Sequence, residues 1–246
     1  METLEWATLL VCCAALLLRV PDAVRGGNRA VFGILFLATL CSVLAVSDLY
    51  EAIDGALGGW DLTSLILRYF VFATVLLVGL RVTRGLAAAR AHQIISGGIG
   101  RWALGLGCLA VTVAFFLMSG SGQPAGLHSQ AAGGAGDAGL APYFTAAGRM
   151  YPAFVSLVLV PPLLAALRSQ LPRLVRAGAL LVLLGAVFAA TSLPAALAPS
   201  SWAVVQHVVN YAAVLGYVAG LAVFWFSGLI ANPSGNAKAT LRQNLD

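Results

Sequence analysis

The chain has 246 residues, of which 60% are hydrophobic and only 9% are charged, and its mean hydropathy is +0.92. Soluble domains carry about 25% charged residues, so this composition excludes a water-soluble globular domain. The formal net charge of +5 does not indicate a nucleic-acid partner, because the basic residues fall in short gaps between apolar runs. Nearly all of these cations are Arg, and together with abundant Ala and Gly this is typical of a high-GC bacterium.

Seven apolar runs approach or exceed the length of about 20 residues that a helix needs to cross a bilayer. Lipid offers backbone amides no other partner, so each run is predicted to be helical. The runs cover residues 4–20, 29–50, 62–82, 101–119, 143–167, 174–197 and 202–230. The predicted fold is therefore all-α: a single seven-transmembrane-helix bundle over residues 1–230, with a short tail over 231–246.

The basic residues between the runs predict the orientation of the bundle. They occupy the first, third and fifth gaps and the tail, while the second, fourth and sixth gaps contain none. The residues concerned are Arg19, Arg25, Arg29, Arg81, Arg84, Arg90, Arg101, Arg168, Arg173, Arg176, Lys238 and Arg242. By the positive-inside rule the N-terminus is outside and the tail is cytoplasmic, in a multi-pass protein of the bacterial cytoplasmic membrane.

An acidic stretch joins the second and third runs and contains Asp48, Glu51, Asp54 and Asp61. Arg68 follows inside the third run, 13 positions before Arg81. That spacing places it about 20 Å from the inner boundary, and so roughly 10 Å below the outer one.

Two interpretations of Arg68 remain open. Its side chain can snorkel toward the outer headgroups and Asp61. Alternatively it faces the bundle interior and lines an outward-opening cavity, with Asp48 or Glu51 as its partner. A cationic residue in such a cavity would favour an anionic or amphipathic ligand.

The last run supplies further polar residues at a similar depth. Asn210 lies about 12 Å and His207 about 7–8 Å below the interfacial Trp202, if the last run is a helix. Together with Arg68, Tyr69 and Asp48 they form the predicted ligand-binding set. The alternative is that they make ordinary hydrogen bonds between helices.

Two features concern packing more than chemistry. Ala212, Gly216 and Gly220 recur every four residues, which predicts close approach of another helix. Pro161 and Pro162 together predict a kink in the fifth run, because they remove two backbone donors.

No catalytic, cofactor or metal motif is visible. The one Lys lies in the tail, which excludes a retinal Schiff base, and only one His lies in an apolar run. There is no HExxH, GxSxG, phosphate-binding loop or Cys/His metal spacing. We therefore expect neither an enzyme nor a bound cofactor.

Residues 21–79, PDAVRGGNRAVFGILFLATLCSVLAVSDLYEAIDGALGGWDLTSLILRYFVFATVLLVG, resemble the membrane module of actinobacterial proteins described as putative transporters. The resemblance lies in hydropathy and spacing: an inner loop with Arg and Asn, a second span, a short outer loop and a third span. It implies a seven-span core with the N-terminus outside, and no catalytic residues.

Three functions are compatible with these patterns. The first is a ligand-sensing or signal-input module with a polar cavity at the outer leaflet. Its arginine-rich inner loops would contact a cytoplasmic or membrane protein partner. The second is a small-molecule transporter that moves at Pro161 and Pro162. The third is a structural or assembly subunit that docks through the small residues of its last helix. The nearly apolar inner halves of the helices favour the first over the second.

Overall fold

The computed structural model describes residues 9–10, 13, 16–17, 29–56, 58, 61–120, 139–198 and 202–231. Within this part of the chain all regular structure is helical and no strand occurs, which confirms the all-α class. Most of the predicted run 4–20 lies outside the described residues. So do residues 121–138 and the tail from 232 onward. Residues 121–138 are most of the fourth gap (120–142), whose Gly, Ala, Ser and Gln content predicts a flexible outer loop.

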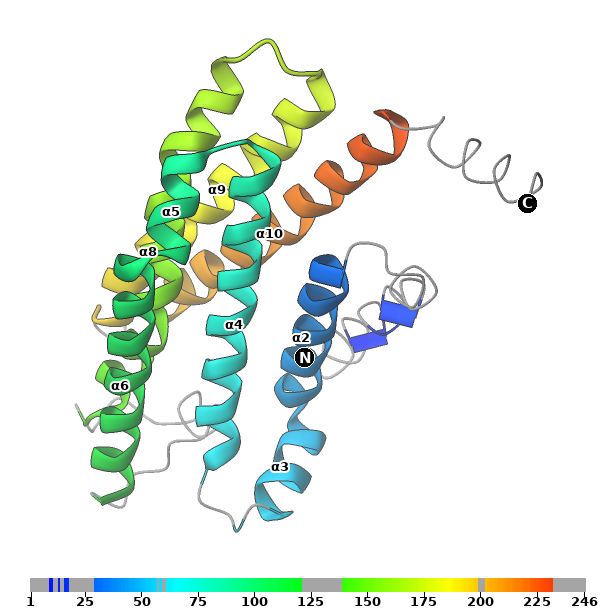
Figure 1. Ribbon diagram of the computed structural model, residues 1–246. Coiled ribbons are helices and arrows are strands. Elements are labelled where there is room, and N and C mark those ends of the chain that lie inside the picture. Colours follow the sequence, from blue (N-terminus) through cyan, green and yellow to red (C-terminus); the bar gives the residue numbers. More distant parts are fainter. Residues whose placement is uncertain are drawn as a thin grey trace.

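Eight helices follow one another along the described chain (Figure 1). They are α2 (Arg29–Ala45), α3 (Ser47–Ala56), α4 (Leu62–Gly85), α5 (Ala89–Ser96), α6 (Gly98–Gly120), α8 (Ala141–Arg168), α9 (Arg173–Ala196) and α10 (Ala203–Ala231).

Among these eight helices of the described chain, four are long and apolar enough to cross a membrane, namely α4, α6, α8 and α9. A fifth candidate is the bent pair of α2 and α3, and α10 contains a shorter apolar stretch over Val208–Phe224.

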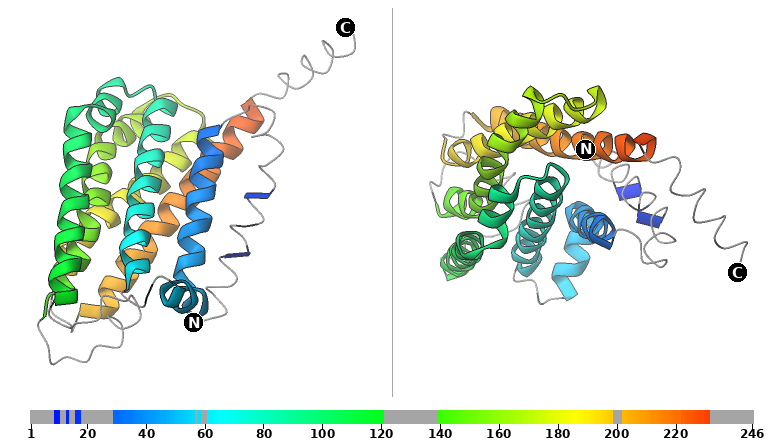
Figure 2. Two further views of the ribbon diagram at one scale, coloured as in Figure 1. Left: turned by 60° about the horizontal axis from the view of Figure 1, so that its bottom comes forward. Right: turned by 45° about the horizontal axis from the view of Figure 1, so that its top comes forward.

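The helices form two layers. Figure 2 shows α6, α4 and α2 side by side in one row, with α8, α9 and α10 behind them. Helix α8 joins the layers, since it packs against α4 and α6 on one side and against α9 on the other. Its fully buried residues Tyr151, Val155, Leu159 and Leu163 recur every four positions, so one stripe of α8 lies at the centre of the core. The helix continues through Pro152, Pro161 and Pro162 without interruption.

Helix α3 turns away from α2 by 89°, so the run predicted over 29–50 is divided between two helices. The change in composition explains the turn. The apolar sequence of α2 ends at Ala45, and α3 is amphipathic, with Tyr50 and Asp54 buried while Glu51 is exposed. A helix of this kind is suited to lie along a membrane surface and not to cross the apolar core.

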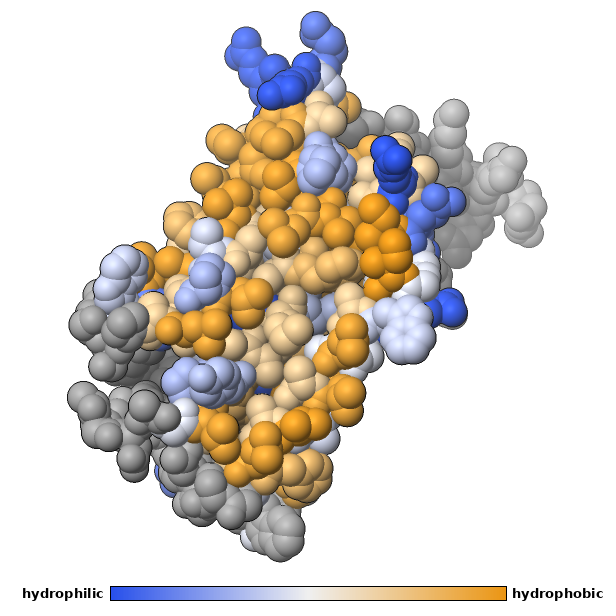
Figure 3. Space-filling view, turned by 90° about the vertical axis from the view of Figure 1, so that its left-hand side faces the viewer, coloured by the Kyte–Doolittle hydropathy of each residue, from blue (hydrophilic) through white to orange (hydrophobic). Residues whose placement is uncertain are grey.

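The arginine-bearing connections gather at one end of the bundle. The α4–α5–α6 connection and the α8–α9 turn lie together at the top of Figure 1, and hydrophilic residues cap the same end in Figure 3. The exposed arginines on these segments are Arg81, Arg84, Arg90, Arg101, Arg168, Arg173 and Arg176. Here the chain also forms α5, which was not predicted; its Ala91 and Ile95 are buried against the bundle.

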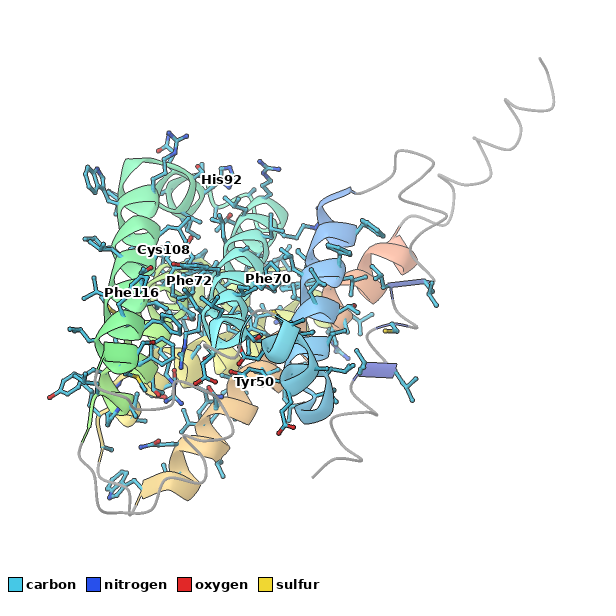
Figure 4. All side chains as sticks on the ribbon, turned by 90° about the horizontal axis from the view of Figure 1, so that it is seen from below. Tyr50, Phe70, Phe72, His92, Cys108 and Phe116 are labelled. Atoms are coloured by element: carbon cyan, nitrogen blue, oxygen red, sulfur yellow. The ribbon has the colours of Figure 1, made fainter. Side chains whose placement is uncertain are left out.

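Between the two ends, the outer face of α6 is apolar. Figure 3 shows hydrophobic side chains spread over this side of the molecule. Those on α6 are Ile99, Trp102, Leu106, Leu109, Val113, Phe116 and Leu117, each about half exposed or more. Figure 4 likewise shows Phe116 pointing away from the bundle while Phe72 lies inside it, on the side of Cys108. Such a face requires an apolar surrounding.

Helices α9 and α10 are in close contact at several glycines. A Cβ atom on Gly216 would lie 2.6 Å from the Cα and 2.7 Å from the backbone nitrogen of Gly185 on α9. A Cβ on Gly220 would likewise meet Val182 and the carbonyl of Gly178. The close approach predicted from the small residues of the last run is therefore confirmed, and its partner is α9.

Candidate functional site

The site lies at the end of the bundle opposite the arginine-rich connections, where α3 and α8 each pack against α4. The local structure begins with Asp54 on α3, which is buried. Its carboxylate accepts hydrogen bonds from the backbone N–H groups of Asp61 (3.1 Å) and Thr63 (3.3 Å), and from the Thr63 hydroxyl (3.1 Å). Asp61 itself is in the left-handed region (φ 55°) and makes no side-chain cap. Asp54 therefore caps α4 from a neighbouring helix, next to the positive end of the α4 dipole.

Arg68 lies in the second turn of α4 and points toward α8. Its guanidinium carbon is 4.0 Å from the centre of the Phe144 ring, and its Nη1 lies against Gly148, where any side chain would collide with it. Its Nε is buried and has no hydrogen-bond partner in the described part of the chain. The side chain is therefore partly buried and is directed toward α8.

A second arginine stands beside it. Arg149 follows Gly148 on α8, and it is near enough to Arg68 for the two positive charges to repel each other. Arg149 donates a hydrogen bond from Nη1 to the backbone carbonyl of Ser192 on α9 (2.8 Å). Among the described residues, no carboxylate forms an ion pair with either arginine.

The carboxylates at this end of the bundle accept hydrogen bonds from groups other than Arg68 and Arg149. Asp61 accepts a hydrogen bond from the Tyr50 hydroxyl (3.5 Å), and Asp54 caps α4. Glu51, one of the two partners predicted for Arg68, is exposed on α3. The other, Asp48, lies in the first turn of α3, and its side chain is outside the described part of the structure.

Of the other predicted ligand-binding residues, Tyr69 has a clear structural partner. Its hydroxyl is 2.6 Å from the Thr112 hydroxyl on α6, and the Thr112 hydroxyl donates to the Cys108 carbonyl (2.7 Å). Thr112 can therefore only accept from Tyr69, and the pair ties α4 to α6.

Asn210 and His207 both lie on α10, whose main neighbour is α9 and not α4. Asn210 is exposed, and no hydrogen bond joins it to Arg68 within the described chain. Nothing is described of the His207 side chain. The structure thus brings Arg68 together with α8 and does not bring it together with Asn210.

Three residues of the site were not predicted, namely Phe144, Gly148 and Arg149. A signal for Arg149 was present in the sequence, because it and Arg68 are the two basic residues that do not fall in the arginine-rich gaps or the tail. Nothing in the sequence distinguishes Phe144 or Gly148 from the many other aromatic residues and glycines in apolar runs.

The described residues offer no other obvious chemistry. No group of three or more His, Cys, Asp or Glu side chains in this part of the chain could hold a metal ion. Comparison with protein-family models, with curated proteins and with solved structures finds no match. The class is therefore defined by the fold and site alone. The described part of the chain is helical, with four or five helices able to cross a membrane, and Arg68 of α4 and Arg149 of α8 lie at one end of it.

Two tyrosines near the middle of the bundle, Tyr151 buried and Tyr217 partly buried, give a direct test of the side-chain packing. Tyr217 on α10 shares a 2.7 Å hydrogen bond with Ser156 on α8, whereas the buried hydroxyl of Tyr151 has no partner among the described residues. Removing a paired hydroxyl costs about 1 kcal/mol, and removing an unpaired one relieves a similar penalty. We therefore expect Tyr217→Phe to lower, and Tyr151→Phe to raise, the free energy of unfolding by about 1 kcal/mol. Equilibrium unfolding in mixed micelles measures both, and equal changes of the same sign would contradict the assignment.

Proposed function

We propose that the chain is an integral membrane protein of seven spans, with its N-terminus outside and its C-terminus in the cytoplasm. The gathering of seven exposed arginines at one end supports this orientation. The apolar outer face of α6 supports a lipid environment. In this arrangement Arg68 and Arg149 lie on the outer side of the membrane.

We further propose that the protein recognises an anionic or amphipathic ligand at this arginine pair and acts as a sensor or signal-input module. The observation that carries the proposal is the buried Nε of Arg68, which has no acceptor among the described residues. An arginine within a span costs about 2.5–3.5 kcal/mol on insertion scales. The contact with Phe144 offsets about 0.5–2 kcal/mol of that cost.

The contact with Phe144 is thus too weak to explain Arg68 by itself, and repulsion from Arg149 adds to the cost. A bound anion would offset both the remaining cost of placing Arg68 in a span and its repulsion from Arg149. The arginines at the opposite end would then contact a cytoplasmic or membrane partner, or anionic lipid, which attracts each of them by about 1 kcal/mol.

The test is the thermal stability of the purified wild-type protein and an Arg68→Leu variant, screened against anionic and amphipathic small molecules. We expect some anions to raise the melting temperature of the wild type by several degrees while leaving the variant unchanged. We also expect Arg68→Leu to be as stable as the unliganded wild type or more stable, because it removes a partly buried charge whose Nε has no acceptor among the described residues.

Arg84→Leu is the matched control, because Arg84 is exposed in the last turn of the same helix. Its melting temperature should respond to the anions as the wild type does. If no anion distinguishes Arg68→Leu from Arg84→Leu, the proposed sensing function is wrong.

A further inference from the structure

We infer that the group recognised by Arg68 and Arg149 is a phosphate monoester, bound through the Nε–Nη2 edge of Arg68. The inference rests on the proposed function and adds to it the chemical class of the ligand and the way in which it is held.

The geometry of Arg68 leaves one edge of the guanidinium without a partner in the described part of the chain. The Nε on this edge is buried, so an anion reaches it only when the side chains around it move. A Cβ on Gly148 would meet the Nη1, Cζ and Cδ atoms of Arg68, so the Nη1–Cδ edge faces α8. The Phe144 ring covers one face of the guanidinium plane. The Nε and Nη2 hydrogens point away from Gly148, and the Nε lacks an acceptor in the described structure. Two parallel N–H groups on one edge match two oxygens of a single oxyanion.

Arg149 favours phosphate over carboxylate. Its Nη1 is held by the Ser192 carbonyl, which fixes a second positive charge next to the first. A carboxylate has one negative charge and two oxygens in a plane, so the edge of Arg68 satisfies it alone. A phosphate monoester carries about −1.5 to −2 charges at neutral pH and has three terminal oxygens, enough for both arginines.

A third donor lies on the same face of α4. Ser64 precedes Arg68 by one turn, its side chain is fully buried, and its hydroxyl has no partner among the described residues. The nearby carboxylates of Asp54 and Asp61 oppose an anion in principle. However, each accepts hydrogen bonds from other groups, at Thr63 and Tyr50, which hold them at the α3–α4 turn.

The phosphate can come from a lipid or from a soluble molecule, and the recognition chemistry is the same. The experiment therefore uses dodecyl phosphate, laurate of the same chain length, and inorganic phosphate. Each is titrated at pH 7.5 into the full-length protein in a neutral maltoside detergent, and the melting temperature is recorded.

We compare the wild type with Arg68→Lys, Gly148→Ala and an Arg84→Lys control. Arg68→Lys keeps the charge but loses the paired N–H edge, so its half-saturating phosphate concentration should rise about tenfold or more. Gly148→Ala displaces Nη1 and should weaken phosphate binding to a similar degree. Arg84→Lys should match the wild type.

A shift with dodecyl phosphate alone, weakened in Arg68→Lys, supports the inference with a lipid source, and a shift with inorganic phosphate supports it with a soluble one. If laurate stabilises the wild type as strongly as dodecyl phosphate, in an Arg68-dependent way, the phosphate assignment is wrong while anion recognition stands. If phosphate binding is equally strong in Arg68→Lys and the wild type, the edge-on geometry is wrong. If no shift with any of the three anions depends on Arg68, both the inference and the proposed function fail.

Discussion

Replacing Gly216 with alanine is expected to lower the free energy of unfolding by about 2–3 kcal/mol. The added methyl group would lie 2.6 Å from the Cα of Gly185 and 2.9 Å from the carbonyl oxygen of Leu181. Both are backbone atoms of α9, so no side chain can move to make room, and α9 and α10 must separate. Helices in lipid associate mainly through such close packing, so the separation removes much of what holds this pair together. Equilibrium unfolding of the purified protein in mixed micelles measures the loss.

Gly105→Ala is the matched control for Gly216→Ala. It makes the same chemical change in the middle of α6, where a Cβ would meet nothing within 4 Å. Alanine favours a helix over glycine by up to about 1 kcal/mol, so this variant should be as stable as the wild type or slightly more so. Equal stability of the two variants would show that α9 and α10 do not touch at Gly216.

Replacing Asp54 with alanine is expected to lower the free energy of unfolding by about 2–3 kcal/mol. The variant loses the acceptor for two backbone N–H groups at the start of α4 and for the Thr63 hydroxyl, which is buried. It also removes a negative charge from the positive end of the α4 dipole. Melting of the purified variant gives the size of the loss.

Two controls separate the cap from a general effect of charge on α3. Asp54→Asn keeps one acceptor oxygen and should recover about half of the loss. Glu51→Ala removes an exposed carboxylate from the same helix and should change stability by less than about 0.5 kcal/mol. A loss as large in Glu51→Ala as in Asp54→Ala would contradict the capping role.

Hydropathy was sufficient to predict the long helices, because length and apolar content alone decide which segments can cross a membrane. Helices α4, α8 and α9 begin and end within a few residues of the runs at 62–82, 143–167 and 174–197. The bend before α3 and the short helix α5 were missed for a common reason. Helix α3, which follows the bend, and helix α5 are amphipathic segments of 10 and 8 residues. Helices this short are stabilised by the elements against which they pack and not by their own composition.

The site could be predicted only in part, since a sequence shows the depth of a residue and not the direction in which it points. Arg68 was identified by its distance from Arg81, and that argument needs no contacts. The choice of α10 as its neighbour needed knowledge of which helices touch. In the structure Phe144 and Gly148 of α8 occupy that place, while α10 packs on α9.

The cap on α4 has a consequence for the order of events during synthesis. Asp54 and Thr63 are only 9 positions apart, so the α3–α4 turn can close as soon as this segment leaves the ribosome. Arg68 meets the opposite situation, because Phe144 and Gly148 are synthesised much later, after α5 and α6. If α4 crosses the membrane as proposed, it must be inserted while its arginine is unshielded, and the apolar residues that follow Arg68 must drive the insertion. The start of α4 is therefore capped early, whereas Arg68 gains its contacts with Phe144 and Gly148 only after α8 has been synthesised. Between these two events the chain is an intermediate in which Arg68 lacks its α8 contacts.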